Sequence, residues 1–171
     1  LVGKEQNKIM SESLENFTNI VKEDIKEAKT LFFSEAFKEE YLKDRREEKE
    51  LYHQLLLGRN RNQILEEFLL SSGQKKPVLL SAAKTIYQAT ITNLDEPLEI
   101  KVKREGWGYL VGKIKSDGTF LSLHKNTFQA EDFEDGTLTI YADMKTIPKD
   151  GDIDHLIIQT VYQTLQIEVV Y

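Results

Sequence analysis

The spacing of apolar residues changes near residues 73–77, and this change limits the chain to two halves that are built differently. Before it, apolar residues recur at steps of three and four, as on one stripe of a helix: Leu14, Phe17, Val21, Ile25, Ala28 and Leu31. After it, apolar and polar residues alternate, as in the run from Ile100 to Lys103, which is typical of strands with one buried face. The pattern therefore predicts an α+β chain, with a helical subdomain over residues 1–73 and a β domain over residues 77–171.

The first half is predicted to form a small helical bundle. Helices are expected at residues 13–33, after Ser34 through residue 42, at 47–57 ending before Gly58, and at 62–70. Helices this short persist only when tertiary packing buries their apolar stripes. We therefore expect them to pack together or on the second half, through an apolar interface that uses the following residues: Phe32, Phe33, Phe37 and Phe68.

The second half is predicted to be an antiparallel immunoglobulin-like β-sandwich. Glycine, proline, asparagine and aspartate residues mark turns between the alternating stretches. Strands are expected near these ranges: 77–80, 85–92, 98–103, 107–115, 119–123, 137–142, 155–160 and 164–170. Their number and spacing suit a Greek-key sandwich, and a small closed barrel is the alternative architecture.

Composition excludes several classes of function. The 171 residues carry a formal net charge of -6, and nucleic-acid binding needs a basic surface instead, so no nucleic-acid partner is expected. No apolar run approaches the roughly 18 residues needed to span a bilayer, so no membrane insertion is expected. With 0 cysteines, the chain has no disulfides, thiolate nucleophiles or thiolate metal sites.

The sequence carries no motif that indicates an enzyme. A serine nucleophile would need a motif such as G-x-S-x-G, and a phosphate-binding loop would need a following helix and a Lys-Ser/Thr pair. The three histidines, His53, His124 and His155, have no metal-ligand neighbour at helical or strand spacing. We therefore expect a non-enzymatic chain without an organic cofactor.

One acidic run could bind a cation. Asp150, Asp152 and Asp154 alternate within a predicted loop, and hard oxygen ligands suit calcium. An EF-hand loop that begins at Asp150 would need glycine and glutamate where His155 and Val161 stand, so that motif is rejected. A looser calcium site at one end of the sandwich and a solvated turn between two strands are the two remaining interpretations.

Two aromatic residues could form a ligand platform. Trp107 lies between Gly106 and Gly108, and Tyr109 follows Gly108. On a single strand, Trp107 and Tyr109 would both point to the same sheet face. A flat aromatic pair on a β-sandwich could hold a sugar ring, which makes a carbohydrate-binding module the alternative function. The structural interpretation is that Trp107 anchors the core between the sheets.

As a set, several stretches resemble a family of large uncharacterised bacterial proteins that carry immunoglobulin-like modules together with helical segments. These stretches are residues 36–41, 51–58, 64–70, 106–109, 120–125, 131–133 and 159–169. The resemblance covers roughly residues 28–171 and implies a helical insert or linker followed by a β-sandwich in a multi-domain chain of unknown function. It carries over no catalytic residue.

The leading hypothesis is a non-enzymatic structural or protein-interaction module. The chain begins with Leu1 and its last residues, up to Tyr171, still read as a strand, so we expect a fragment of a larger bacterial protein. Its expected partners are another protein or neighbouring domains of the parent chain.

Overall fold

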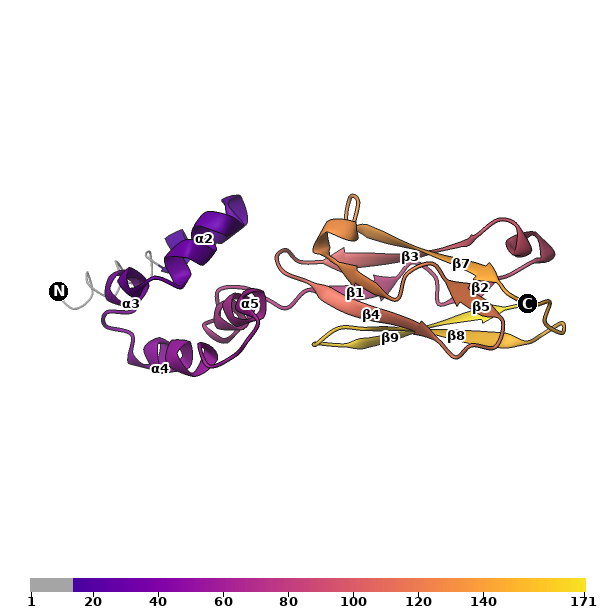
Figure 1. Ribbon diagram of the computed structural model, residues 1–171. Coiled ribbons are helices and arrows are strands. Elements are labelled where there is room, and N and C mark those ends of the chain that lie inside the picture. Colours follow the sequence, from indigo (N-terminus) through magenta and orange to yellow (C-terminus); the bar gives the residue numbers. More distant parts are fainter. Residues whose placement is uncertain (1–13) are drawn as a thin grey trace. The chain divides into compact units, whose positions relative to one another are not determined.

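The computed structural model describes residues 14–171 and confirms the α+β class (Figure 1). The chain divides into two compact units between Pro77 and Val78. The first unit is helical and the second contains all the strands of the described chain. In the described part of the chain, no helix combines the length and the apolar character needed to cross a membrane.

The helical unit contains more breaks than the sequence predicted. The helix expected at 13–33 begins outside the described residues, and the described part is interrupted at Asp24 (φ -147, ψ 92). The Asp24 carboxylate accepts a hydrogen bond from the Glu27 N–H at 3.2 Å and so caps a new helix. The observed helices are residues 14–23, α2 Ile25–Phe32, α3 Glu35–Tyr41, α4 Arg46–Leu55 and α5 Arg61–Ser71.

Aromatic rings form the core of the helical unit. The Phe32 ring lies 5.0 Å from Phe37, 5.0 Å from Tyr52 and 5.2 Å from Phe68, measured between ring centroids. The Tyr52 hydroxyl donates to the Phe32 carbonyl oxygen at 2.5 Å. These rings hold four short helices together, because each helix alone is too short to be stable in water.

The phenylalanines expected at an interface with the second half thus have another role. Phe32, Phe37 and Phe68 are fully buried, and the ring contacts above account for that burial within the helical unit. Phe33 is half-buried, with the Arg61 guanidinium 4.4 Å from its ring centroid. Sequence alone could not distinguish an interface from a core, because both require exposed apolar stripes on isolated helices.

The second unit is a β-sandwich, as predicted, but it is not wholly antiparallel, because residues 86–88 pair parallel with residues 168–170. A four-stranded sheet has the order β1-β3-β7-β5 and a five-stranded sheet has the order β2-β9-β8-β4-β6. In the described residues these are separate sheets, so the closed-barrel alternative is wrong. The strands are β1 Leu79–Ala82, β2 Ile86–Gln88, β3 Leu98–Glu105, β4 Val111–Ser116, β5 Leu121–Leu123, β6 Thr127–Gln129, β7 Thr137–Met144, β8 Ile153–Gln159 and β9 Thr164–Val170.

Two predicted strands end differently in the structure. The strand expected at 85–92 stops at Gln88 and is followed by a 3-10 helix, η1 Ile91–Leu94. The strand expected from residue 107 begins only at Val111, because Gly106 (φ 99) and Gly108 (φ 102) turn the preceding chain out of the extended conformation. The alternation of apolar and polar residues therefore predicts the interior of a strand better than it predicts where the strand begins and ends.

Two stretches of the sandwich repeat each other, which the sequence analysis had missed. We call residues 79–105 the first repeat and residues 121–144 the second repeat. Each runs from a short strand in the four-stranded sheet to an edge strand in the five-stranded sheet, then through a 3-10 turn (η1, or η2 Ala130–Asp132) back to a long strand. At an offset of 41 residues, identical residues recur: Leu80 and Leu121, Ser81 and Ser122, Lys84 and Lys125, Gln88 and Gln129, Ala89 and Ala130.

The two repeats make similar hydrogen bonds where they enter the 3-10 turns, although β2 pairs parallel with β9 and β6 pairs antiparallel with β4. The Ala89 N–H donates to Val170 on β9, and the Ala130 N–H donates likewise to Leu110 beside β4. The long strands β3 and β7 pair antiparallel with Ile100 opposite Ile140. The repeats are therefore related by an approximate two-fold axis through the middle of the four-stranded sheet.

Candidate functional site

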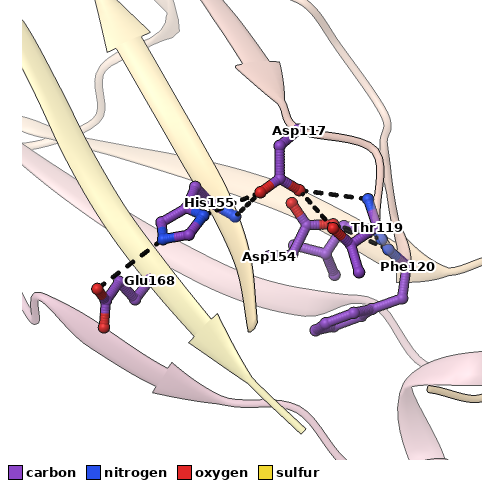
Figure 2. A network of polar contacts seen from close by, with 7 residues as sticks. Asp117, Thr119, Phe120, Asp154, His155 and Glu168 are labelled. Atoms are coloured by element: carbon purple, nitrogen blue, oxygen red, sulfur yellow. Dashed lines mark hydrogen bonds and ion pairs between the residues drawn. The ribbon is translucent and has the colours of Figure 1, made fainter. Parts of the chain in front are cut away.

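The most unusual polar side chain of the sandwich is Asp154, which lies in β8 and is fully buried. Strand alternation turns it inward with Leu156 and Ile158. Its Oδ2 accepts hydrogen bonds from the Phe120 N–H at 3.0 Å and the Leu121 N–H at 2.9 Å (Figure 2). A single carboxyl group thus attaches β8 to the start of the second repeat.

Asp117 lies beside Asp154 and joins it to the surface (Figure 2). Its Oδ1 accepts from the Thr119 hydroxyl at 2.9 Å, and its Oδ2 lies 2.9 Å from His155 Nδ1. On its other side, His155 Nε2 lies 3.9 Å from a carboxylate oxygen of Glu168. The four groups form one network from the buried carboxyl to solvent.

The two neighbouring carboxyl groups have opposite pKa shifts. Burial raises the pKa of Asp154, and the Asp117 carboxylate raises it further. A hydrogen bond from Asp154 lowers the pKa of Asp117, and hydrogen bonds from His155 and Thr119 lower it too. Asp154 Oδ1, which receives no N–H bond from the described residues, lies next to the Asp117 carboxylate. The side-chain contact between the two carboxyl groups is thus a cause of both shifts, raising the pKa of Asp154 and lowering that of Asp117.

This network is suited to holding the fold together rather than to acid–base catalysis. Asp154 is fully buried, so a substrate would not reach it, and both its backbone partners lie at the start of β5. The first repeat is anchored at the equivalent position by a neutral group. There the Leu80 N–H donates to Gln163 Oε1 at 2.7 Å, and Gln163 Nε2 donates back to the Leu80 carbonyl at 2.9 Å.

The structure does not bring together the three aspartates of the predicted calcium site. Asp150 is exposed, Asp152 accepts a hydrogen bond from the Lys149 N–H at 3.1 Å, and Asp154 points into the core. Over residues 14–171, no group of three His, Asp or Glu side chains is placed to hold a metal ion. The prediction missed that Asp154 already belongs to β8, where strand geometry separates it from the turn.

Trp107 and Tyr109 lie in the loop between β3 and β4, not on a common strand. Both side chains are half-buried, so Trp107 is neither a fully buried core residue nor a fully exposed ring. The Arg104 guanidinium braces this loop, because Nε donates to the Gly106 carbonyl and Nη2 to the Gly108 carbonyl, each at 3.2 Å. The structure thus places the aromatic pair on a braced loop.

The three histidines are widely distributed over the fold. His53 is exposed on α4, His124 Nε2 lies 2.7 Å from Asp143 Oδ2, and His155 contacts Asp117. Sequence analysis missed Asp117 and Gln163 altogether. Asp154 had a usable signal, since it occupies an inward position in the alternation of β8.

The chain was compared with known families and proteins. The sequence profile of the N-terminal region of a family of unknown function, DUF5717, matches residues 2–171, which confirms the resemblance to an uncharacterised family. No curated protein matches the chain.

Three solved structures are similar to part of this chain at low identity. One is the crystal structure of the apo form of the Calx CBD1 domain, with a TM-score of 0.38 and 11% identity over 56% of this chain and 97% of that one. Another is the E. coli chaperone DraB, with a TM-score of 0.38 and 6% identity over 54% of this chain and 53% of that one. A third is the endo-beta-1,4-mannanase from Thermotoga petrophila, with a TM-score of 0.30 and 14% identity over 63% of this chain and 23% of that one.

Proposed function

This chain belongs to the DUF5717 family of unknown function, and we propose that it is a non-enzymatic structural module that binds a protein partner. The proposed contact surface is the outer face of the five-stranded sheet. The buried network of Asp154 and Asp117 supports a structural role, because its hydrogen bonds are made to the protein's own backbone and side chains.

The observation that carries the proposal is an apolar patch on a sheet face that should be polar. Ile86 is 58% exposed on β2 and Ile153 is 41% exposed on β8. Val170 on β9 pairs with Ile153 of β8 and, on its other side, with Gln88 of β2, two residues after Ile86. Ile157 lies on the same outer face of β8 as Ile153. We call these four apolar residues the outer patch. Ile86 and Ile153 are exposed, Val170 and Ile157 are half-buried, and Glu168 lies among them, paired with Ile86 on β2 and with His155 on β8. Apolar residues interspersed with polar ones on one face are typical of contact surfaces.

A photo-crosslinking experiment tests the proposal. A benzophenone side chain at position 86 should crosslink one discrete protein in the cells that express the chain. Ile153→Lys should remove that product, because it places a charge directly beside Val170 in the outer patch. Val161→Lys is the matched control, since Val161 is 67% exposed in the turn at the opposite end of β8. Equal crosslinking in both variants would contradict the proposal.

A further inference from the structure

The second repeat contains a cavity of about 330 Å³ at the open side of the sandwich. Its apolar wall consists of Ile114 from β4, Phe128 from β6, and Leu138 and Ile140 from β7, while His124 and other polar residues line its opening. This volume is at the lower end of the range for small-molecule sites, and an apolar wall with a few polar groups is their usual composition.

The cavity exists because β5 is too short to cover β7. Residues 121–123 pair only with residues 142–144 at the end of β7. The chain then crosses to the other sheet, where the Ile114 N–H donates to the Asn126 carbonyl at 2.8 Å. The middle of β7 therefore has β3 on one side and no strand on the other within the described residues.

The register of β7 determines which backbone groups face this gap. The Ala83 N–H donates to the Lys101 carbonyl on the β1 side of β3. The backbone N–H and carbonyl groups of Lys101, and of Glu99 two residues before it, therefore point away from β7. Their partners in β7, Thr139 and Tyr141, must then face the cavity side. The Tyr141 carbonyl accepts from the His124 N–H at 3.0 Å, but within residues 14–171 no backbone bond runs back from the Tyr141 N–H to the His124 carbonyl.

The first repeat closes the equivalent gap with a hydroxyl group. Tyr87 is buried between the sheets, and its hydroxyl accepts a hydrogen bond from the Lys101 N–H at 3.1 Å. The equivalent residue in the second repeat is Phe128, which has no hydroxyl. Its ring leans over Gly112, so closely that a Cβ on that glycine would lie 2.2 Å from Phe128 Cζ. The Tyr141 N–H is thus left facing the cavity.

The residues around the cavity disfavour two kinds of occupant, an added β-strand and a charged ligand. The gap is closed at one end by the His124–Tyr141 bond and at the other by the Glu134–Thr137 pair, so an added strand would have too little edge. At the opening, His124 faces Asp143 at 2.7 Å and Lys125 faces Asp132 at 3.9 Å. Because the Asp143 carboxylate and the Lys125 ammonium already have polar partners at the opening, the cavity favours a neutral ligand.

We propose that this cavity is a binding site for a small uncharged phenol. The ring would lie against Ile114, Leu138 and Ile140, and the hydroxyl oxygen would accept the hydrogen bond of the Tyr141 N–H. The ligand would supply to the second repeat the group that Tyr87 supplies to the first. This inference does not depend on the outer patch, which lies on the other face of the five-stranded sheet.

Titration with p-cresol, followed by ¹⁵N–¹H spectra of the wild-type chain, tests the proposal. We expect saturable shifts of the Tyr141 and Thr139 amides. Toluene, which has the same ring and methyl group but no hydroxyl, should bind about fivefold more weakly, as expected for the loss of one hydrogen bond. Absence of a saturable shift at these amides, or equal affinity for the two compounds, would overturn the proposal.

Two variants provide matched controls for the titration. Ile114→Phe should fill the cavity and abolish the shifts, while Tyr87→Phe should leave them unchanged because it alters only the first repeat. Loss of binding in Tyr87→Phe with retention in Ile114→Phe would contradict the assignment. If Ile114→Phe does not fold, the comparison of p-cresol with toluene on the wild-type chain still decides.

Discussion

The two repeats of the sandwich have the same order of strands, but different side chains hydrogen-bond the backbone groups that strand pairing leaves over. The N–H of Leu80 in the first repeat is held by the Gln163 amide, and the equivalent N–H of Leu121 is held by the Asp154 carboxyl. The N–H of Lys101 is held by the Tyr87 hydroxyl, while Phe128 cannot offer the same bond in the second repeat. The first repeat is thus closed by neutral groups, and the second carries a titratable anchor and an open cavity.

This difference shows which features the repeated pattern needs and which it leaves free to vary. The retained identities, such as Gln88 with Gln129 and Ala89 with Ala130, lie where the chain enters the 3-10 turn. The side chains that hold the N–H groups of Leu80 and Leu121 come from the turn before β9 and from β8, outside the repeats, whereas Tyr87, which holds the Lys101 N–H, belongs to the first repeat. Function can therefore vary at these positions without a change of strand order.

The largest expected effect comes from removal of the two anchors. Asp154→Ala leaves two buried N–H groups without an acceptor and should lower the free energy of unfolding by about 3 kcal/mol. Gln163 is half-buried, and Gln163→Ala leaves the N–H and the carbonyl of Leu80 without this partner. We expect this variant to lower the free energy of unfolding by about 1 kcal/mol. Urea unfolding of both variants measures the difference, and equal losses would show that the anchors are equivalent.

A second prediction concerns the glycine under Phe128. In Gly112→Ala the new Cβ would lie 2.2 Å from the Phe128 ring and 2.7 Å from the Gln159 carbonyl oxygen, so we expect a loss of about 2 kcal/mol from overpacking. Combination with Phe128→Ala should recover part of this loss in a double-mutant cycle. Strict additivity of the two losses would rule out the contact as the cause.

A third prediction concerns the hydroxyl that closes the first repeat. Tyr87→Phe removes the acceptor of the Lys101 N–H and should lower the free energy of unfolding by about 1 kcal/mol. Tyr141→Phe is the control, because the Tyr141 side chain is exposed and should cost close to nothing. A Tyr87→Phe variant as stable as the wild type would mean that its hydroxyl does not close the repeat.

The smallest expected effect is on pH dependence. The pKa of Asp154 is raised in the folded state from the ordinary 3.8, so above pH 3.8 the folded chain holds a proton that the unfolded chain has released, and stability falls as pH rises through that window. The lowered pKa of Asp117 acts in the opposite direction: its contribution is present above its ordinary pKa and is lost as pH falls through its lowered value.

Asp154→Asn separates these two contributions. Asparagine can keep a hydrogen bond to Asp117 without titrating, so the variant should gain stability relative to the wild type as pH rises from 4 towards neutrality, a range set by the direction of the Asp154 shift. Thermal unfolding across this range measures the difference. A pH-independent difference between the two proteins would show that Asp154 titrates normally.

Much of the fold could be predicted from residue spacing, because burial imposes a period on each element. The alternation of Ile100 and Val102 with lysines identified β3, and the apolar steps before Phe33 identified helices. The break at Asp24 was missed because a capping side chain competes with the helix locally without disturbing its apolar stripe. Helix ends depend on such single hydrogen bonds.

The candidate site was less predictable, because it depends on contacts between residues far apart in the chain. Asp154 was noticed only as one of three acidic residues, and its meeting with Phe120 depends on the packing of the two sheets. The recurrence of Leu-Ser at Leu80 and Leu121 was visible in the sequence. The hydroxyl that separates Tyr87 from Phe128 gains its meaning only when the two repeats are superposed in the structure.

Amide hydrogen exchange tests most directly the claim that one repeat is closed and the other open. In the wild-type chain we predict that the Lys101 N–H is protected and that the Tyr141 N–H exchanges at least about tenfold faster, although both lie on paired central strands. Tyr87→Phe should bring Lys101 to the rate of Tyr141. Equal protection of the two amides in the wild type would contradict the account.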